Sequence, residues 1–524
     1  MFSIAILIGI YSYLIFIVGI LGFLNKSTIL TASLIFILSA YFYFRKKSKE
    51  FPTFSFSKFK PKLLLYIFLF MALINLIGAL GPEFSFDALW YHLTIPKIFI
   101  NEHKIFFIPG GLFYYSIMPK LGEMLFIPAL MFGNEIISKL IQWTFGMLSA
   151  FVVYKISRNF FDQKLSIIAS LIFYSSLVVA WQSTIAYIDL IRTFFEIMAL
   201  WGFLEFYKSK NKKWLVESAV MVGLAISTKL IALGTILIFV SLLLIFEKNR
   251  KKATENALIF FVLSLLVPIP WFFFSFLNTG NPLYPIFSGY PIDSYAFFNF
   301  QNLIEDLFQL FFKADDPISP VYIMFLPLIF ILFKNFDKRL KIIALYSLIS
   351  LMVWYLTPRT GGGRFILPYL PVFSILASSV IANIKIVWLK KYLTALVIAV
   401  CLITITYRGI ANSKFIPVIL GQQTKDEFLT INLNFSFGDF YDTDGWFAKN
   451  ISGKDKVLLF GFHNLYYANF PFIHESYVKK RDKFNYIATQ NSVLPQRFSY
   501  WNLIYYNKAT GVGVYSLKGE MWHY

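Results

Sequence analysis

The feature that most constrains this chain is a succession of long apolar runs separated by short basic segments. A helix that crosses the hydrocarbon core of a membrane needs about 20 apolar residues, with about 17 as the practical minimum. Thirteen segments come close to this length, at residues 3–24, 27–44, 63–81, 136–155, 165–182, 190–207, 214–228, 230–246, 256–277, 317–334, 340–357, 365–384 and 389–407. We therefore expect an α-helical polytopic membrane protein with about 13 transmembrane helices.

The composition excludes other classes of protein. Only 15% of the residues are charged and 58% are hydrophobic, whereas a soluble globular protein carries about 25% charged residues. The single cysteine, Cys401, excludes a disulfide framework and a cysteine-rich metal module. The net charge of +20 lies in short clusters between apolar runs, which indicates cytoplasmic loops and not nucleic-acid binding.

The distribution of Lys and Arg predicts the orientation. If the N-terminus is cytoplasmic, the basic clusters all fall in inner loops, at residues 45–62, 155–164, 208–213, 248–252, 334–341 and 385–391. The outer loops hold far fewer basic residues, as the positive-inside rule requires. Basic residues that merely solubilised loops would not alternate in this way.

Three regions follow from this arrangement. Residues 1–62 are expected to form an N-terminal transmembrane hairpin and a basic cytoplasmic loop, and residues 63–407 a membrane core with a long outer loop at 82–135. Residues 408–524 are less hydrophobic and contain short strand patterns at 456–460, 501–506 and 512–515. We expect this tail to be a small extracytoplasmic α/β domain.

The long first outer loop contains the most informative acidic residue. Asp87 lies about two helical turns beyond the third span, so its carboxylate is expected at the membrane interface. A carboxylate there is suited to taking the proton from an acceptor hydroxyl beside a lipid phosphate. The alternative is that Asp87 caps the short helix that follows it, since Asp is a favoured N-cap residue.

Six short segments stand out in order along the chain. They are Asp-Ala-Leu-Trp-Tyr-His-Leu at 87–93, Tyr-Ser-Ile-Met-Pro-Lys-Leu-Gly-Glu-Met-Leu at 115–125, Ala-Tyr-Ile-Asp-Leu at 186–190, Gly-Leu-Ala-Ile-Ser-Thr-Lys at 223–229, Thr-Gly-Asn-Pro-Leu-Tyr-Pro at 279–285 and Arg-Phe-Ile-Leu-Pro-Tyr-Leu-Pro at 364–371. In this order they resemble the motifs of GT-C class glycosyltransferases that use lipid-phosphate sugars, in the branch of the protein O-mannosyltransferases and aminoarabinose transferases. The resemblance covers roughly residues 63–385, and the hairpin at 1–44 is an apparent addition.

The resemblance implies that Asp87 is the catalytic base or orients the acceptor. The family often has Asp-Glu at this point, but here Ala88 follows Asp87, so a second carboxylate must come from elsewhere. We therefore assign no metal ligands and no cofactor. A divalent metal at Asp87, His92, His103 and Glu123 is a weaker alternative, because their spacing matches no metal-site pattern.

Three residues are candidates for binding the acceptor or the sugar. Asp189 lies in the acidic turn of the second outer loop, and the alternative for it is an ion-pair ladder with Arg192 and Glu196 along one helix face. His92 could bond the sugar or the carboxylate, and Glu123 could supply the second carboxylate. The alternatives for these two are a structural histidine and an ordinary interfacial residue.

Three cations are candidates for binding the donor phosphate. Lys229 interrupts a long apolar stretch with basic clusters at both ends, which predicts a hairpin with Lys229 at its outer tip, and the alternative is a lysine snorkelling to the interface. Arg359 and Arg364 flank a Gly-rich outer turn, and the planar guanidinium suits a phosphate. The alternative for both is a flexible turn with charged residues beside it.

The resemblance implies an integral membrane glycosyltransferase with its active site on the non-cytoplasmic face. The donor would be a polyprenyl-phosphate-linked sugar, the reaction inverting, and the acceptor a protein, lipid or glycan hydroxyl. One alternative is an oligosaccharyltransferase that uses a pyrophosphate-linked glycan and a metal. Another is a lipid or polysaccharide transporter without chemistry, which internal repeats would favour. The expected partners include membrane lipids but no nucleic acid.

Overall fold

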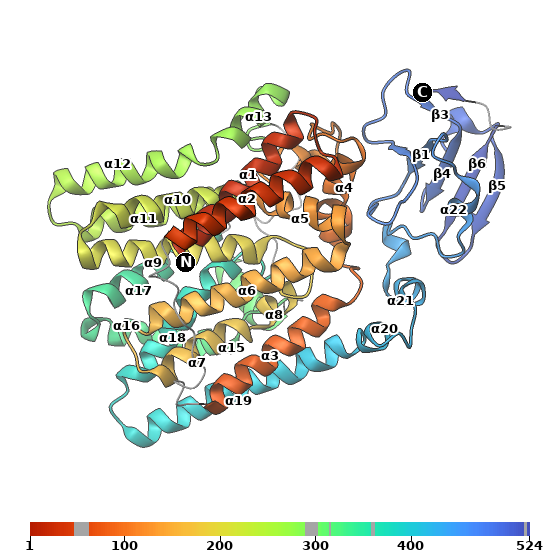
Figure 1. Ribbon diagram of the computed structural model, residues 1–524. Helices are drawn as coiled ribbons and strands as arrows, with labels where there is room; N and C mark the ends of the chain where they lie inside the picture. Colours follow the sequence, from red (N-terminus) through yellow and green to blue (C-terminus); the bar gives the residue numbers. More distant parts are fainter. Residues whose placement is uncertain (47–61, 289–301, 314–315, 358–361, 518–520) are drawn as a thin grey trace.

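The computed structural model describes residues 1–46, 62–288, 302–313, 316–357, 362–517 and 521–524. A body of helices lies beside a small domain that contains the β-strands, and the two meet at one end of the body (Figure 1). The principal helices of the body are α1 (Phe2–Ile20), α2 (Lys26–Lys46), α3 (Lys62–Leu80), α4 (Thr94–Asn101), α5 (Leu121–Phe132), α6 (Glu135–Ser157), α7 (Gln163–Tyr174), α8 (Leu177–Gln182), α9 (Asp189–Ser209), α10 (Lys212–Thr228), α11 (Leu233–Phe246), α12 (Arg250–Leu266), α13 (Ile269–Thr279), α14 (Leu303–Phe308), α15 (Pro320–Phe325), α16 (Ile329–Leu332), α17 (Lys338–Leu356), α18 (Leu370–Asn383) and α19 (Val387–Ser413).

The expectation of a multi-pass, mostly helical membrane protein is confirmed, but the count of thirteen spans is not. Among the described residues, six helices are long and apolar enough to cross a membrane, and the pair α12 and α13, bent by 57°, would make a seventh. Other predicted spans are broken into shorter pieces. The segment at 165–182 divides into α7 and α8, and the segment at 317–334 divides at a turn that contains Pro327.

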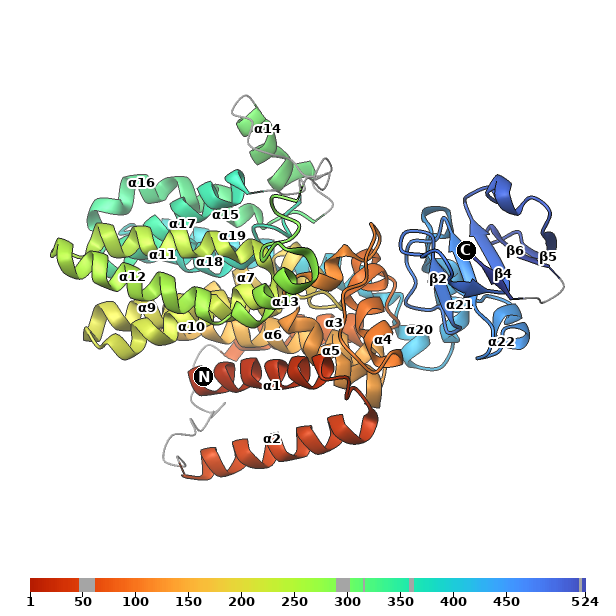
Figure 2. The same ribbon diagram turned by 90° about the horizontal axis from the view of Figure 1, so that it is seen from above.

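The helices alternate in direction, so the loops divide between the two ends of the body. α1, α3 and α19 end beside the small domain, while the basic clusters at 208–213 and 248–252 lie at the opposite end (Figures 1 and 2). The loops that carry the candidate site residues are therefore gathered at the end next to the small domain. The side of the membrane on which this end lies stays a prediction from the positive-inside pattern.

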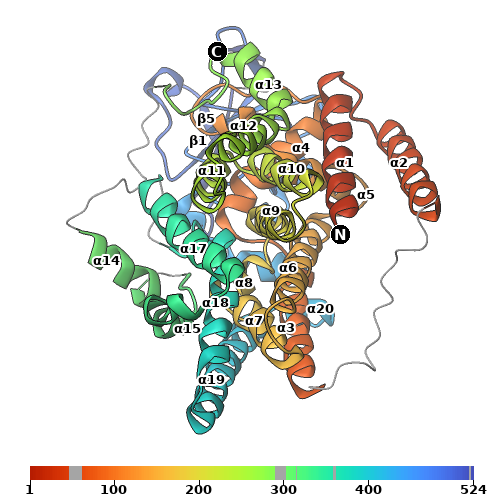
Figure 3. The same cartoon turned by 90° about the vertical axis from the view of Figure 1, so that its left-hand side faces the viewer.

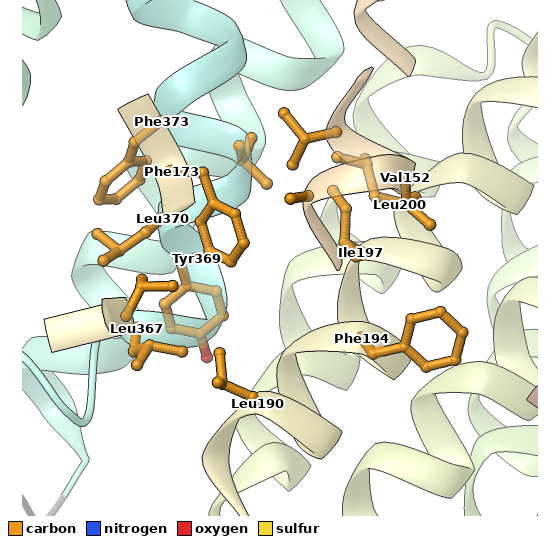
Figure 4. Packing of buried hydrophobic residues seen from close by; sticks show 14 of the residues in the cluster. Val152, Phe173, Leu190, Phe194, Ile197, Leu200, Leu367, Tyr369, Leu370 and Phe373 are labelled. Atoms are coloured by element: carbon orange, nitrogen blue, oxygen red, sulfur yellow. The ribbon is translucent and has the colours of Figure 1, made fainter. Parts of the chain in front are cut away.

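Helix α9 forms the centre of the body. Its side chains are buried on every face, as expected of a helix that packs against neighbours all round. Figure 4 shows Leu190, Phe194 and Ile197 of α9 in the same cluster as Tyr369, which directly precedes α18, and Phe373 of α18. This packing brings the start of α9, where Asp189 lies, close to residues immediately after Arg364.

Helix α2 lies at one edge of the body, on the side opposite α14 and α15 (Figure 3). Ile29 is its only buried residue, and the exposed residues include Leu34, Ile35 and Phe42. In a membrane such a surface faces lipid. Helix α2 is thus peripheral to the core that holds the site, whereas α1 packs against it, for example through the bond between the Tyr13 and Ser227 hydroxyls.

The small C-terminal domain has the predicted α/β character. α19 continues to Ser413, beyond the predicted end at residue 407, and α20 (Ile416–Ile419) and α21 (Lys425–Asn432) lead into the domain. A five-stranded sheet has the order β2-β1-β4-β6-β5, in which β1 is parallel to β2 and β4, while β6 is antiparallel to β4 and β5. The remaining elements are α22 (Trp446–Asn450), β1 (Val457–Phe460), β2 (Phe472–His474), β3 (Lys483–Phe484), β4 (Tyr486–Gln490), β5 (Asn502–Asn507), β6 (Val512–Ser516) and β7 (Trp522–His523).

Candidate active site

Asp87 is positioned by the turn that follows α3. It directly precedes a single π-helical turn, Ala88–His92, but its side chain makes no capping hydrogen bond to that turn. The carboxylate instead accepts a hydrogen bond from the Tyr91 hydroxyl over 2.9 Å and one from the Arg364 guanidinium. The structure therefore disfavours the capping interpretation, because the carboxylate bonds two side chains and not the backbone it would cap.

Arg364 connects the two acidic outer loops. Its Nη1 donates to Asp87 Oδ2, and its Nε donates to Asp189 Oδ2 over 2.8 Å. The guanidinium lies 4.2 Å from the ring centre of Tyr187, and the Arg364 backbone N–H donates to Asp316 Oδ2 over 2.8 Å. A guanidinium has donors in a fixed planar fork, so one side chain can hold two carboxylates at a set separation.

Lys229 is the second cation that contacts Asp189, in addition to Arg364. It lies at the break between α10 and α11, as the hairpin prediction requires, and its Nζ donates to Asp189 Oδ1 over 2.6 Å. Its side chain is 18% exposed, whereas that of Asp189 is 1% exposed. Asp87, Arg364, Asp189 and Lys229 therefore alternate in charge, with the two cations balancing the two carboxylates.

The electrostatic surroundings keep Asp87 ionised. Burial by itself would raise the pKa of this carboxyl, but the charge of Arg364 and the hydrogen bonds from Arg364 and Tyr91 hold the pKa below its ordinary value. An ionised carboxylate is the form that can accept a proton. Asp87 is thus in the protonation state that a general base needs at neutral pH.

The ion-pair ladder considered for Asp189 is not present. Arg192 Nε donates to Glu196 Oε1 over 2.6 Å inside the body, and Arg192 also bonds the Tyr369 hydroxyl over 3.4 Å. Asp189 takes no part in this pair and bonds Lys229 and Arg364 instead. The position of Asp189 at the start of α9 turns its side chain toward the outer loops.

His92 and Glu123 form a second, buried cluster next to Asp87. His92 Nδ1 lies 2.9 Å from Glu123 Oε1, and Lys120 Nζ donates to the same oxygen over 3.2 Å. Burial lowers the pKa of His92, against the opposing effect of Glu123, so the imidazole is neutral at pH 7. In this structure the two side chains hold each other, and their contact with a sugar or an acceptor stays a prediction.

Two further expectations have different outcomes. Arg359 lies outside the described residues, so its role as a phosphate ligand stays a prediction. In the described part of the chain, no three His, Cys, Asp or Glu side chains come together as a possible metal site. The set Asp87, His92, His103 and Glu123 does not assemble, and His103 instead contacts the backbone oxygen of Leu24.

Sequence reasoning missed several residues that shape this site. Glu83 is fully buried, and its carboxylate accepts backbone N–H groups of Phe84, Ser85 and Ala186. The Tyr187 hydroxyl accepts the backbone N–H of Asp87 over 3.1 Å. Only Tyr187 had a sequence signal, since it lies inside the 186–190 motif. The run Gly81-Pro82-Glu83 indicates a turn but not the partner of Glu83.

Part of this chain is similar in sequence to one family of known proteins. The sequence model of the family described as dolichyl-phosphate-mannose-protein mannosyltransferase matches residues 124–274. No curated protein matches the chain as a whole or in part. The family match thus covers the region from α5 to α13, which includes Asp189 and Lys229.

Solved structures show the same fold at low sequence identity. ArnT from Cupriavidus metallidurans in the apo state has a TM-score of 0.56 and 13% identity, with 86% of this chain and 97% of ArnT covered. ArnT bound to undecaprenyl phosphate gives 0.53 and 13%, with 86% and 98% covered. The oligosaccharyltransferase AglB from Archaeoglobus fulgidus, in complex with an inhibitory peptide and a dolichol-phosphate, gives 0.50 and 12%, with 88% and 74% covered. The family match and the shared fold together confirm the resemblance of this chain to the GT-C class of membrane glycosyltransferases.

Proposed function

We propose that this protein transfers a sugar from a polyprenyl-phosphate donor to an acceptor hydroxyl, on the non-cytoplasmic face of the membrane and with inversion at C1. The observation that carries the proposal is the row Asp87, Arg364, Asp189 and Lys229. In this row Asp87, the proposed base, bonds Arg364, and Asp189 links Arg364 to Lys229. That combination is what attack by a hydroxyl and departure of a phosphate require.

The proposed step balances in a simple way. The Asp87 carboxylate takes the proton of the acceptor hydroxyl, and the hydroxyl oxygen forms the new bond to C1 of the sugar. The bond between C1 and the phosphate oxygen breaks, and its electron pair leaves with the lipid phosphate. Lys229 and Arg364 stabilise the negative charge that develops there, and such charge stabilisation is usually the largest single contribution to catalysis.

The charge balance of the resting site also has a consequence for donor binding. Lys229 has three N–H donors, and the structure uses one of them for Asp189. A phosphate can therefore approach Lys229 from its exposed side while Asp189 continues to hold the lysine in place. Because Asp189 already neutralises much of this charge, release of the product phosphate is favoured as well.

An apolar cavity offers a place for the lipid part of the donor. Its volume is about 720 Å³, and it is lined by apolar side chains of α14, α15, α17 and α18, with Ile318 among them. Ile318 lies against Gly363, since a Cβ on that glycine would come within 2.8 Å of Ile318 Cγ2. One residue that lines the cavity therefore contacts the residue that precedes Arg364, which supports the proposal that a lipid tail bound there has its phosphate near the cations.

The test uses purified protein with synthetic polyprenyl-phosphate sugars and measures release of the lipid phosphate. We expect turnover by the wild type and a loss of about 10²–10⁴-fold in Asp87→Asn, the range that a positioned proton transfer supplies. Asp444→Asn, in the C-terminal domain, is the matched control, because its carboxylate bonds Tyr505 and not the site. Equal turnover by wild type and Asp87→Asn would remove Asp87 from the reaction, and no turnover across a broad donor panel would favour a transporter.

A further inference from the structure

The C-terminal domain touches the same outer loop that carries Asp87. Lys97 of α4 donates from Nζ to the backbone oxygens of Tyr466 and Ala468, over 2.6 and 3.0 Å, and to Asn469 Oδ1 over 2.6 Å. The Tyr466 backbone N–H donates to the Leu89 oxygen over 3.3 Å. Residues 466–469 of the domain are therefore held against α4 and, through Tyr466, against the π-helical turn that begins after Asp87.

Aromatic side chains extend this contact to the immediate neighbours of Asp87. The His463 ring stacks on Phe86 with centroids 4.9 Å apart and an interplanar angle of 24°, and it lies 4.6 Å from Trp90. The Phe437 ring packs edge-on against the Phe86 ring, with centroids 5.1 Å apart. Offset and edge-to-face pairs of this kind stabilise a fixed arrangement. The domain thus limits the positions that the residue before Asp87 can take.

A chain of hydrogen bonds also runs from the domain to both acidic loops. The Tyr467 hydroxyl donates to the Glu83 backbone oxygen over 2.7 Å. The Glu83 carboxylate accepts the N–H groups of Phe84 and Ser85 over 2.9 and 2.8 Å, and that of Ala186 over 2.6 Å. Ser85 lies two residues before Asp87, and Ala186 lies three before Asp189. Glu83 therefore joins the two loops whose carboxylates meet at Arg364.

We propose that Glu83 and Tyr467 are positioning residues, through which the C-terminal domain holds the Asp87 and Asp189 loops at the separation that Arg364 spans. This inference rests on the proposed function, because it gives the domain its role in that reaction. Neither residue touches the reacting atoms. A buried carboxylate that satisfies three backbone N–H groups fixes the loops more tightly than packing alone, since each unmade bond would leave a buried polar group unpaired.

The expected effect concerns rate more than donor binding. Displacement of a catalytic group by about 1 Å can cost about 100-fold in rate. We therefore expect Glu83→Gln to lower kcat at least about tenfold, because the amide cannot accept at both ends. Tyr467→Phe removes the hydrogen bond to the Glu83 backbone oxygen and a longer one, over 3.4 Å, to Glu135 Oε1, and a fall of about two- to tenfold is expected. The KM for the donor should change less than kcat in both variants.

A pH profile separates positioning from a general loss of structure. The groups that face Asp87 are Arg364, Tyr91, Tyr187, His92 and His463. If the loops shift, Asp87 loses its contact with Arg364, its pKa rises, and the acid limb of kcat moves to higher pH. A loss of stability alone lowers the yield of folded protein but does not move the acid limb of the pH profile of kcat.

The experiment measures lipid-phosphate release against pH for the wild type, Glu83→Gln and Tyr467→Phe, with thermal melting recorded for each. Tyr505→Phe is the control, because its hydroxyl bonds Asp444 within the domain. An upward shift of the acid limb in both test variants and not in the control supports the inference. Unchanged kcat and limb in folded Tyr467→Phe overturns it, while an inactive wild type would instead refute the proposed function.

Discussion

Arg364→Lys is the sharpest test of the site, because it keeps the positive charge and removes the fork. In the wild type, Arg364 uses Nη1 for Asp87 and Nε for Asp189, two atoms on one rigid plane. A lysine ammonium is a single point of charge on a flexible stem. The ammonium can bond either Asp87 or Asp189, but it has no second nitrogen with which to bond the other carboxylate.

The magnitude follows from the bond that is lost. A hydrogen bond to a charged group contributes about 1.5–3 kcal/mol, and about 1.4 kcal/mol corresponds to a tenfold change in rate. If the lost contact acts in the transition state, Arg364→Lys lowers kcat/KM by about 10- to 150-fold. Arg364→Gln removes the charge as well and should cost more, since one partner of a buried ion pair is then left unpaired.

The direction of the pH effect can be worked out for Arg364→Gln. In the wild type, Arg364 holds the Asp87 pKa below its ordinary value, so the base stays ionised as the pH falls toward 4. Without Arg364, burial is the largest remaining influence and raises the Asp87 pKa. Protonation then removes the base at a higher pH, and the acid limb of the rate moves upward.

The assay is release of the lipid phosphate, followed as a function of pH and donor concentration. Arg339→Lys is a suitable control, because Arg339 pairs with Asp337 at 3.5 Å on a partly exposed surface where ion pairs contribute little. Wild-type turnover and an unmoved acid limb in folded Arg364→Gln would refute the reasoning. Such a result would mean that the bridge is structural and that catalysis takes place elsewhere.

Three other predictions test separate parts of the molecule. Lys229→Gln should lower lipid-phosphate release about tenfold or more, and adding Asp189→Asn should cost less than the sum of the two single changes, because the residues bond each other. Leu348→Trp, which narrows the apolar cavity, should raise KM several-fold for a long-chain donor and leave a short-chain donor unaffected. Burial lowers the His474 pKa to about 4, so the C-terminal domain should lose roughly 3 kcal/mol of stability as the pH falls from about 6.5 to 4. Melting curves of the wild type and His474→Gln would show this, and equal pH dependence in the two would contradict it.

Much of the fold follows from local sequence patterns. Long apolar runs predict membrane helices, because backbone N–H and C=O groups without hydrogen-bond partners are too costly in hydrocarbon. Each predicted segment coincides with one α-helix or with two consecutive α-helices. The strands at β1, β5 and β6 follow from short β-forming runs in the tail. The breaks between α7 and α8 and between α12 and α13 were not predicted, because the run of apolar residues continues across each bend.

The candidate site was predicted only in part. The interfacial position of Asp87 and the hairpin tip at Lys229 depend on distance from a span, which the sequence contains. The bridge from Arg364 to Asp87 joins residues 277 positions apart, and the bond from Tyr467 to Glu83 joins residues 384 positions apart. No periodicity or spacing encodes such partners.

The sequence by itself therefore determined the class of protein and predicts both the alternation of its loops and the acids and cations of the candidate site. Hydropathy and charge are properties of each segment, and they determine which segments span a membrane and in which orientation. The tertiary structure alone decided which charges meet, because helix packing around α9 sets the separation of the outer loops. It also decided that the C-terminal domain rests on the Asp87 loop, a contact between surfaces that no single segment specifies.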